Sequence, residues 1–138
     1  MVRVNLIGPK KLSDQHLVAE YREILVLLSY IIKHPDLENI SKKYTLGKGH
    51  MKFFKDKVSY LYNRFEKIKE EMNKRGFETN RKFDFKNLSK KNRGEFHPSK
   101  EDLELIKKRL RERIRMKPNF YRYYGKYRGK DFFLGLLK

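Results

Sequence analysis

The residues best suited to chemistry lie on one polar stripe of a predicted helix. Positions three, four and seven apart share a helix face, so one broad face carries Gln15, His16, Ala19, Arg22 and Glu23. Glu23 therefore lies among residue types that bind DNA. The spacing alone fits ordinary solvated charges on an amphipathic helix better than a site, so it needs support from elsewhere in the chain.

The same stripe has a spacing that would fit metal ligands on one helix face. His16, Glu20 and Glu23 follow one another at intervals of four and three residues. A helical metal site needs further ligands from neighbouring helices, and neither Glu66 nor Glu70 completes a Glu-x-x-His pattern. We therefore expect no metal.

A glycine-rich segment, LGKGH, ends at His50. Its two glycines permit tight turns, which could let backbone amides approach a phosphate at the start of a helix. The Lys and Ser/Thr of a P-loop are absent from the required positions, so this phosphate signal is weak. A packing role for His50 fits the pattern at least as well.

Aromatic and basic side chains interleave near the C-terminus. The interleaved residues are Tyr121, Arg122, Tyr123, Tyr124, Lys126, Tyr127 and Arg128. This combination suits phosphate contacts and stacking on exposed bases. Because burial is the commonest use of aromatic rings, we expect some of them to cover the core and others to face a partner.

The charge balance indicates a polyanionic partner. The 138 residues include 35 Lys and Arg against 17 Asp and Glu, a formal net charge of +18, and such a particle repels itself unless a polyanion neutralises it. Nucleic acid is the leading class. An anionic membrane would favour a basic helix with a bulky apolar face or a lipid-anchor signal, and the N-terminus shows neither.

The remaining composition narrows the cellular setting. Cysteine is absent, which excludes disulfides and thiolate metal sites and suits a reducing compartment. No apolar run approaches the roughly 20 residues that span a bilayer, and no signal peptide pattern precedes the first polar residues. We expect a cytoplasmic protein associated with DNA.

Three helices must position these residues. Apolar residues recur at helical spacing over about 14–33, 50–75 and 100–115. The pattern predicts an all-α protein, a single compact domain over 1–138, with an irregular C-terminal segment. The connection over 79–93 should be irregular and touch the core at its apolar positions, which are Phe83, Phe85 and Leu88.

Three ordered blocks of sequence carry a family resemblance. They are VRVNL followed by LSDQHLVAEYREI, then TLGKGHMKFFKDK with KRGF closing the second helix, and finally KPNFYRYYGK. The first block reproduces residue types and also the distance from the N-terminus to a helix glutamate. Together the blocks resemble the pyrimidine-dimer DNA glycosylase family, the phage endonuclease V type of ultraviolet-damage repair enzyme, over nearly the whole chain.

The resemblance implies a glycosylase that is also an abasic-site lyase. Met1 would be removed, and the α-amine of Val2 would attack C1′ of the damaged nucleotide at an active site reached by an extended N-terminal segment. Glu23 matches the catalytic carboxylate. A terminal amine suits this role because its ordinary pKa of about 7.7 to 8.0 leaves more neutral nucleophile than that of lysine at about 10.4. Arg3 and Arg22 should lower the pKa of the amine further.

The resemblance also assigns DNA contacts and partners. The positions that match DNA-binding ones are Arg3, Gln15, His16, Arg22, Arg109, Arg113, Tyr121 and Arg122. The partner would be double-stranded DNA containing ultraviolet lesions, bent and with a flipped nucleotide. No metal, organic cofactor or membrane is implied, and we expect a monomer.

Two positions depart from the family pattern. Val2 stands where threonine is common, which keeps a primary amine and a side chain small enough for methionine removal. Val26 stands where some members have a basic residue, which removes a possible phosphate contact. The apolar tail from Phe132 onward extends beyond the resemblance and could pack on the core or mediate association.

Two other functions remain open from the sequence. One is a non-catalytic basic DNA-binding protein on the same scaffold. The other is a glycosylase or lyase that acts on a different base lesion or on abasic sites.

Overall fold

The computed structural model describes residues 3–138, which form a mainly helical protein. Its α-helices are α1 (Asp14–Lys33), α2 (His50–Phe53), α3 (Val58–Lys74), α4 (Lys100–Met116) and α5 (Lys130–Leu136). Its 3-10 turns are η1 (Pro9–Lys11), η2 (Phe54–Asp56) and η3 (Lys90–Asn92), and β1 (Arg122–Tyr123) pairs with β2 (Lys126–Tyr127) in a small antiparallel hairpin. The all-α expectation is therefore broadly confirmed.

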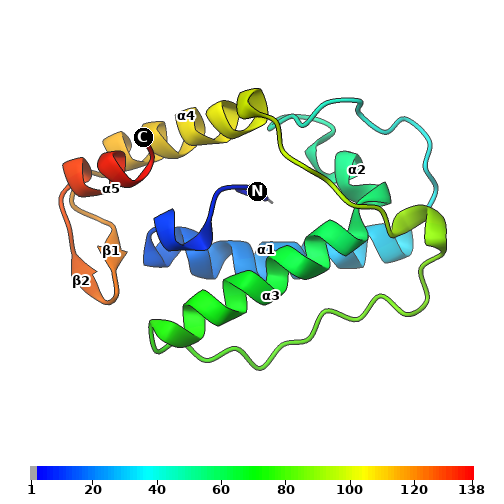
Figure 1. Cartoon of the computed structure of the whole chain (residues 1–138), viewed down its shortest axis with the longest axis horizontal. Coiled ribbons are helices and arrows are strands. Elements are labelled where there is room, and N and C mark those ends of the chain that lie inside the picture. The colour runs from blue at the N-terminus through cyan, green and yellow to red at the C-terminus, as the bar shows by residue number, and fades with distance from the viewer. Residues whose placement is uncertain (1–2) are drawn as a thin grey trace.

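α1 and α3 pack against each other, and α4 lies on the other side of the N-terminal segment (Figure 1). α1 and α4 each begin at a side-chain cap that the sequence signals. Ser13 accepts a hydrogen bond from the backbone amide of His16 at the start of α1. Ser99 and Asp102 form both hydrogen bonds of a capping box at the start of α4, although the box usually prefers Glu or Gln as its second member.

The expectation of one helix over 50–75 is wrong, because the chain breaks at Lys57. A segment from the following connection pairs with the backbone there: Lys57 forms a β-bridge with Arg93, and the amide of Gly94 donates to the carbonyl of Asp56 at 3.0 Å. A helix through Lys57 would need that carbonyl for itself. Gly94 must be glycine, since a Cβ there would collide with the Asp56 carbonyl oxygen.

The connection over 79–93 is irregular, as expected, apart from η3. Phe83 and Leu88 are buried and Phe85 is half-buried, so the three apolar positions do meet the core. Asn92 is also buried and donates to the carbonyls of Lys55 and Pro35 at 2.8 and 3.0 Å. The side chain of Asn92 thus satisfies the Lys55 carbonyl beside the helix break and also joins this region to the chain that follows α1.

The C-terminal segment is more regular than predicted. After the hairpin, the apolar tail forms α5 and packs on α4 (Figure 1). Phe133 and Leu137 are buried, and Arg111 of α4 donates to the carbonyl of Leu137 at 2.8 Å. The tail therefore packs on the core. Its seven residues are too few to have stood out as a helix by apolar spacing.

The buried apolar residues form one cluster that extends from Val4 to Leu137. Val4 belongs to an N-terminal segment without regular secondary structure, and it is fully buried between the helices. Within residues 3–138 no helix is long and apolar enough to cross a bilayer.

Candidate active site

A pocket of about 190 Å³ opens where the N-terminal segment passes between α1 and α4. Its lining comes from those elements and consists of Arg3, Asn5, His16, Ala19, Glu23, Arg109, Leu110 and Arg113. The structure thus brings together half of the site residues predicted from sequence. Arg3 and Asn5 of the N-terminal segment form one wall of this pocket.

Glu23 is the carboxylate that lines this pocket. The backbone amide of Arg3 donates to its Oε2 at 3.2 Å, so Glu23 holds the N-terminal segment directly. Burial raises the pKa of Glu23 above its ordinary value, although the hydrogen bond from the Arg3 amide opposes the shift. A carboxyl group with a raised pKa is better able to donate a proton near neutral pH than an ordinary glutamate.

Three arginine residues line the pocket together with the Glu23 carboxylate. Arg3 comes from the N-terminal segment, and Arg109 and Arg113 are one helical turn apart on α4. Burial and the nearby charge of Arg109 lower the pKa of Arg3. The mutual repulsion of these cations is relieved when an anion enters, so the pocket suits a phosphate-bearing substrate.

His16 lines the pocket, and its ring has both a hydrogen-bond partner and a stacking partner. Its Nδ1 is 2.9 Å from Ser13 Oγ, and its ring stacks on Tyr121 with centroids 4.8 Å apart. Burial, assisted by Arg113, lowers the pKa of His16 to about 4. The imidazole is therefore neutral at pH 7, and it offers a stacking surface and a hydrogen bond rather than a charge.

The stability of the protein should fall as the pH falls from about 6.5 to about 4. His16 and His50 both have a pKa of about 4 when folded against 6.5 ordinarily, so the unfolded chain binds more protons across this window. We expect each histidine to remove on the order of 1 kcal/mol of stability per pH unit. Urea unfolding at pH 7, 6 and 5 measures this slope.

Glu23 affects the pH dependence in the opposite direction, since its raised pKa favours proton binding by the folded state. The histidine contribution is therefore isolated by comparison with His50→Gln, which cannot titrate. We expect a shallower slope for the variant. Equal slopes for the two proteins would mean that His50 is not held neutral by the fold.

Gln15, Arg22 and Arg122 line a neighbouring groove rather than the pocket. This groove of about 400 Å³ shares only Ala19 with the pocket wall, and Phe77 also lines it. The Gln15 amide donates to the carbonyl of Phe120 at 2.9 Å and accepts from the amide of Arg122 at 3.0 Å. Gln15 thus holds the C-terminal segment against α1, while the side chains of Arg22 and Arg122 are exposed.

The metal-like spacing on α1 does not bring ligands together. Glu20 is fully buried and forms a two-point ion pair with Arg64 of α3, and its Oε1 lies 2.9 Å from Arg64 Nη2. His16 is engaged with Ser13 instead. Over residues 3–138 no three His, Cys, Asp or Glu side chains are grouped as metal ligands would be.

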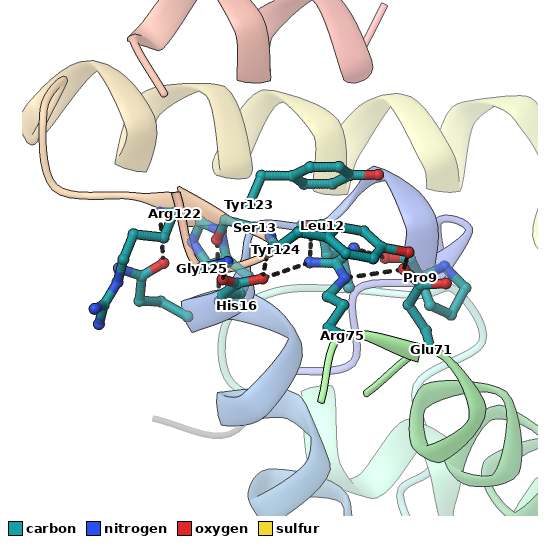
Figure 2. A network of polar contacts seen from close by, with 12 residues as sticks. Pro9, Leu12, Ser13, His16, Glu71, Arg75, Arg122, Tyr123, Tyr124 and Gly125 are labelled. Carbon is teal, nitrogen blue, oxygen red and sulfur yellow. Dashed lines mark hydrogen bonds and ion pairs between the residues drawn. The ribbon is translucent and has the colours of Figure 1, made fainter. Parts of the chain in front are cut away.

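A buried network around Arg75 was missed by the sequence analysis. Arg75 ends α3, and its guanidinium donates to Asp14 at 3.0 Å, to Glu71 at 2.9 Å and to the carbonyls of Leu12 and Pro9. The rings of Tyr123 and Tyr124 cover it at 4.5 and 5.0 Å, as Figure 2 shows. These two rings therefore serve the fold.

The same network fixes the hairpin against the start of α1. Asp14 accepts from the backbone amides of Tyr124 and Gly125 at 3.1 and 2.8 Å and from Arg75, so its carboxylate joins the start of α1, the end of α3 and the hairpin turn. The only sequence signal was the KRGF block. The buried Asn5 in the pocket and the contacts of His50 were also not foreseen as parts of the site.

These features define a class of protein: a basic helical protein whose small pocket holds one carboxylate among guanidinium groups, suited to a polyanionic substrate. Residues 1–85 match the model of the family described as pyrimidine dimer DNA glycosylase. Because this match covers more than half of the 138 residues, the chain belongs to the pyrimidine dimer DNA glycosylase family. The predicted resemblance is confirmed, although the third block lies beyond the matched range.

Proposed function

We propose that this protein excises cyclobutane pyrimidine dimers from double-stranded DNA and then nicks the strand as an abasic-site lyase. The observation that carries the proposal is the contact between the Arg3 amide and Glu23 in a pocket lined by guanidinium groups. Val2, whose α-amine would be the nucleophile once Met1 is removed, lies outside the described residues. The proposal therefore rests on the surroundings of Arg3, the residue that follows Val2.

Covalent geometry keeps the proposed nucleophile near its partner. Consecutive backbone nitrogens are at most about 3.6 Å apart in any chain conformation. The nitrogen of Arg3 is 3.2 Å from Glu23 Oε2, so the nitrogen of the preceding residue is within reach of the same carboxylate. A nucleophile and an acid/base group held in one small pocket are what covalent catalysis requires.

The reaction proceeds in two parts. The amine of Val2 attacks C1′ of the damaged nucleotide, the bond from C1′ to the base breaks with its electron pair, and Glu23 in its acid form supplies a proton to assist departure. The nitrogen then loses a proton, its lone pair expels O4′, and O4′ takes up that proton as the sugar ring opens, which leaves the nitrogen joined to C1′ as a protonated imine. The Glu23 carboxylate next takes a proton from C2′, and the electron pair expels the phosphate oxygen on C3′, so the strand is cut on the 3′ side.

The remaining site residues serve DNA binding in this proposal. Arg3, Arg109 and Arg113 would hold phosphates beside the lesion, and the ring of His16, which stacks on Tyr121, contributes an aromatic surface to the pocket wall. Gln15, Arg22 and Arg122 border the adjoining groove and would meet the duplex beyond the pocket. The high positive charge should make binding strongly dependent on salt.

Borohydride trapping tests the proposal. Protein of known intact mass, which reports whether Met1 is absent, is incubated with a duplex containing one cyclobutane thymine dimer. Borohydride reduces an imine to a stable amine, so we expect a covalent protein–DNA adduct that peptide mapping locates at residue 2. An undamaged duplex of the same sequence is the control and should give none.

Each other outcome of the trapping experiment contradicts a stated part of the proposal. Binding without an adduct would indicate a non-catalytic DNA-binding protein. An adduct that maps to a lysine would exclude the terminal amine as the nucleophile. If only an abasic duplex is trapped and nicked, the glycosylase assignment fails while the lyase remains.

A further inference from the structure

The N-terminal segment is held by its backbone and not only by its apolar side chains. Both backbone polar groups of Val4 form hydrogen bonds: its amide donates to Nε2 of His50 at 3.0 Å, and its carbonyl accepts from the hydroxyl of Tyr44 at 2.6 Å. Farther along, Arg64 donates to the carbonyl of Ile7 at 2.7 Å. An extended segment needs such partners, because it makes no regular backbone hydrogen bonds of its own.

Both ring nitrogens of His50 form hydrogen bonds with backbone groups. Nδ1 lies 2.7 Å from the carbonyl oxygen of Thr45, and that oxygen can only accept. Nδ1 therefore carries the proton, which leaves Nε2 as the acceptor for the Val4 amide. Burial lowers the pKa of His50 to about 4, so the neutral tautomer that this contact requires is the one present at pH 7.

Tyr44 is equally constrained. Its ring is buried and meets the ring of His50 edge to face with centroids 5.4 Å apart, and the rings of Phe53 and Phe54 surround it. The hydroxyl group therefore has a fixed position when it donates to the Val4 carbonyl. Neither Tyr44 nor His50 lines the pocket.

We propose that Tyr44 and His50 are positioning residues for the N-terminal nucleophile, which they hold against Glu23 by fixing the peptide groups of Val4. The inference rests on the proposed function. Only Arg3 lies between Val4 and Val2, so a displacement of Val4 is carried through a short covalent tether to the reacting nitrogen. A misplacement of about 1 Å can lower the rate of a reaction about a hundredfold, because a near-attack geometry is lost.

The cleanest test is Tyr44→Phe, which removes one hydroxyl group and keeps the ring contacts. The measured quantities are the single-turnover rate of imine trapping at saturating damaged DNA and, separately, the Kd for that DNA. We expect the trapping rate to fall about tenfold, the factor that corresponds to the loss of one hydrogen bond from the reacting geometry. The Kd should stay within about twofold, because the pocket lining is unchanged.

Tyr21→Phe is the matched control. Tyr21 is a buried tyrosine of α1 whose hydroxyl also bonds a backbone group, the amide of Arg81 at 2.8 Å, and its ring stacks on Phe65 away from the pocket. This variant should lose comparable stability and keep the wild-type trapping rate. Similar rates for Tyr44→Phe and Tyr21→Phe would overturn the inference.

A second pair of variants tests His50. In His50→Gln the side-chain oxygen can still accept from the Val4 amide, whereas His50→Phe keeps an aromatic ring without an acceptor. We expect His50→Gln to trap several times faster than His50→Phe at equal Kd, and equal rates would contradict the role of the acceptor. If the wild-type protein itself gives no adduct, the proposed function fails rather than the positioning role alone.

Discussion

Glu23→Gln should abolish most strand nicking while leaving DNA binding nearly intact. Glutamine keeps the shape of the side chain and can still accept from the Arg3 amide, so the N-terminal segment keeps its position. It cannot donate a proton as an acid or take one from C2′. Acid–base catalysis of this kind contributes about 10² to 10⁴ in rate, so we expect a loss of at least about a hundredfold.

Nicking of a duplex with a single thymine dimer measures this loss, and gel-shift titration measures binding. Glu112→Gln is the control: it makes the same change of charge at an exposed carboxylate of α4 that does not line the pocket. The control variant should nick at the wild-type rate. Unchanged nicking by Glu23→Gln would remove Glu23 from the mechanism.

The pocket could be anticipated from sequence to the extent that it is built from helix periodicity. His16, Ala19 and Glu23 face the same side of α1 as their spacing predicts, and Arg109 and Arg113 face them from α4 for the same reason. The distance between these two helices is not encoded in either pattern. The family resemblance was needed to connect them.

What could not be anticipated depends on backbone groups that have no side-chain signal. The break at Lys57 arises because residues 93–94 pair with residues 56–57, and nothing in the apolar spacing of 50–75 reports that pairing. The hydrogen bonds that Val4 makes with Tyr44 and His50 likewise use its backbone amide and carbonyl. Its side chain indicates only that the position is apolar. The LGKGH pattern fits either phosphate binding or packing for His50, whereas its ring in fact forms hydrogen bonds with the backbone of Val4 and Thr45.

Arg75→Met should destabilise the protein by about 3–5 kcal/mol, the usual loss when one member of a buried ion pair is removed. The Arg75 side chain is fully buried, with Asp14 and Glu71 as its carboxylate partners. Methionine fills a similar volume but leaves both carboxylates without a cation and two carbonyls without a donor. Urea denaturation at pH 7 gives the change in the free energy of unfolding.

Lys74→Met is the matched control for this change. Lys74 is the neighbouring residue on α3 and pairs with Glu70, but both side chains are about half exposed or more, so their ion pair should contribute at most about 1 kcal/mol. Equal destabilisation by the two variants would mean that the Arg75 network contributes no more to stability than a surface pair.

Loss of Arg75 should also weaken the binding of damaged DNA. Asp14 contacts Arg75 and the hairpin turn together, and Gln15 beside it holds the backbone around Tyr121, whose ring supports His16 in the pocket wall. A loosened hairpin therefore displaces the aromatic side of the site although Arg75 itself does not line the pocket. We expect the Kd for damaged DNA to rise severalfold for Arg75→Met under conditions in which the variant is still folded. An unchanged Kd would mean that the Arg75 network does not affect DNA binding.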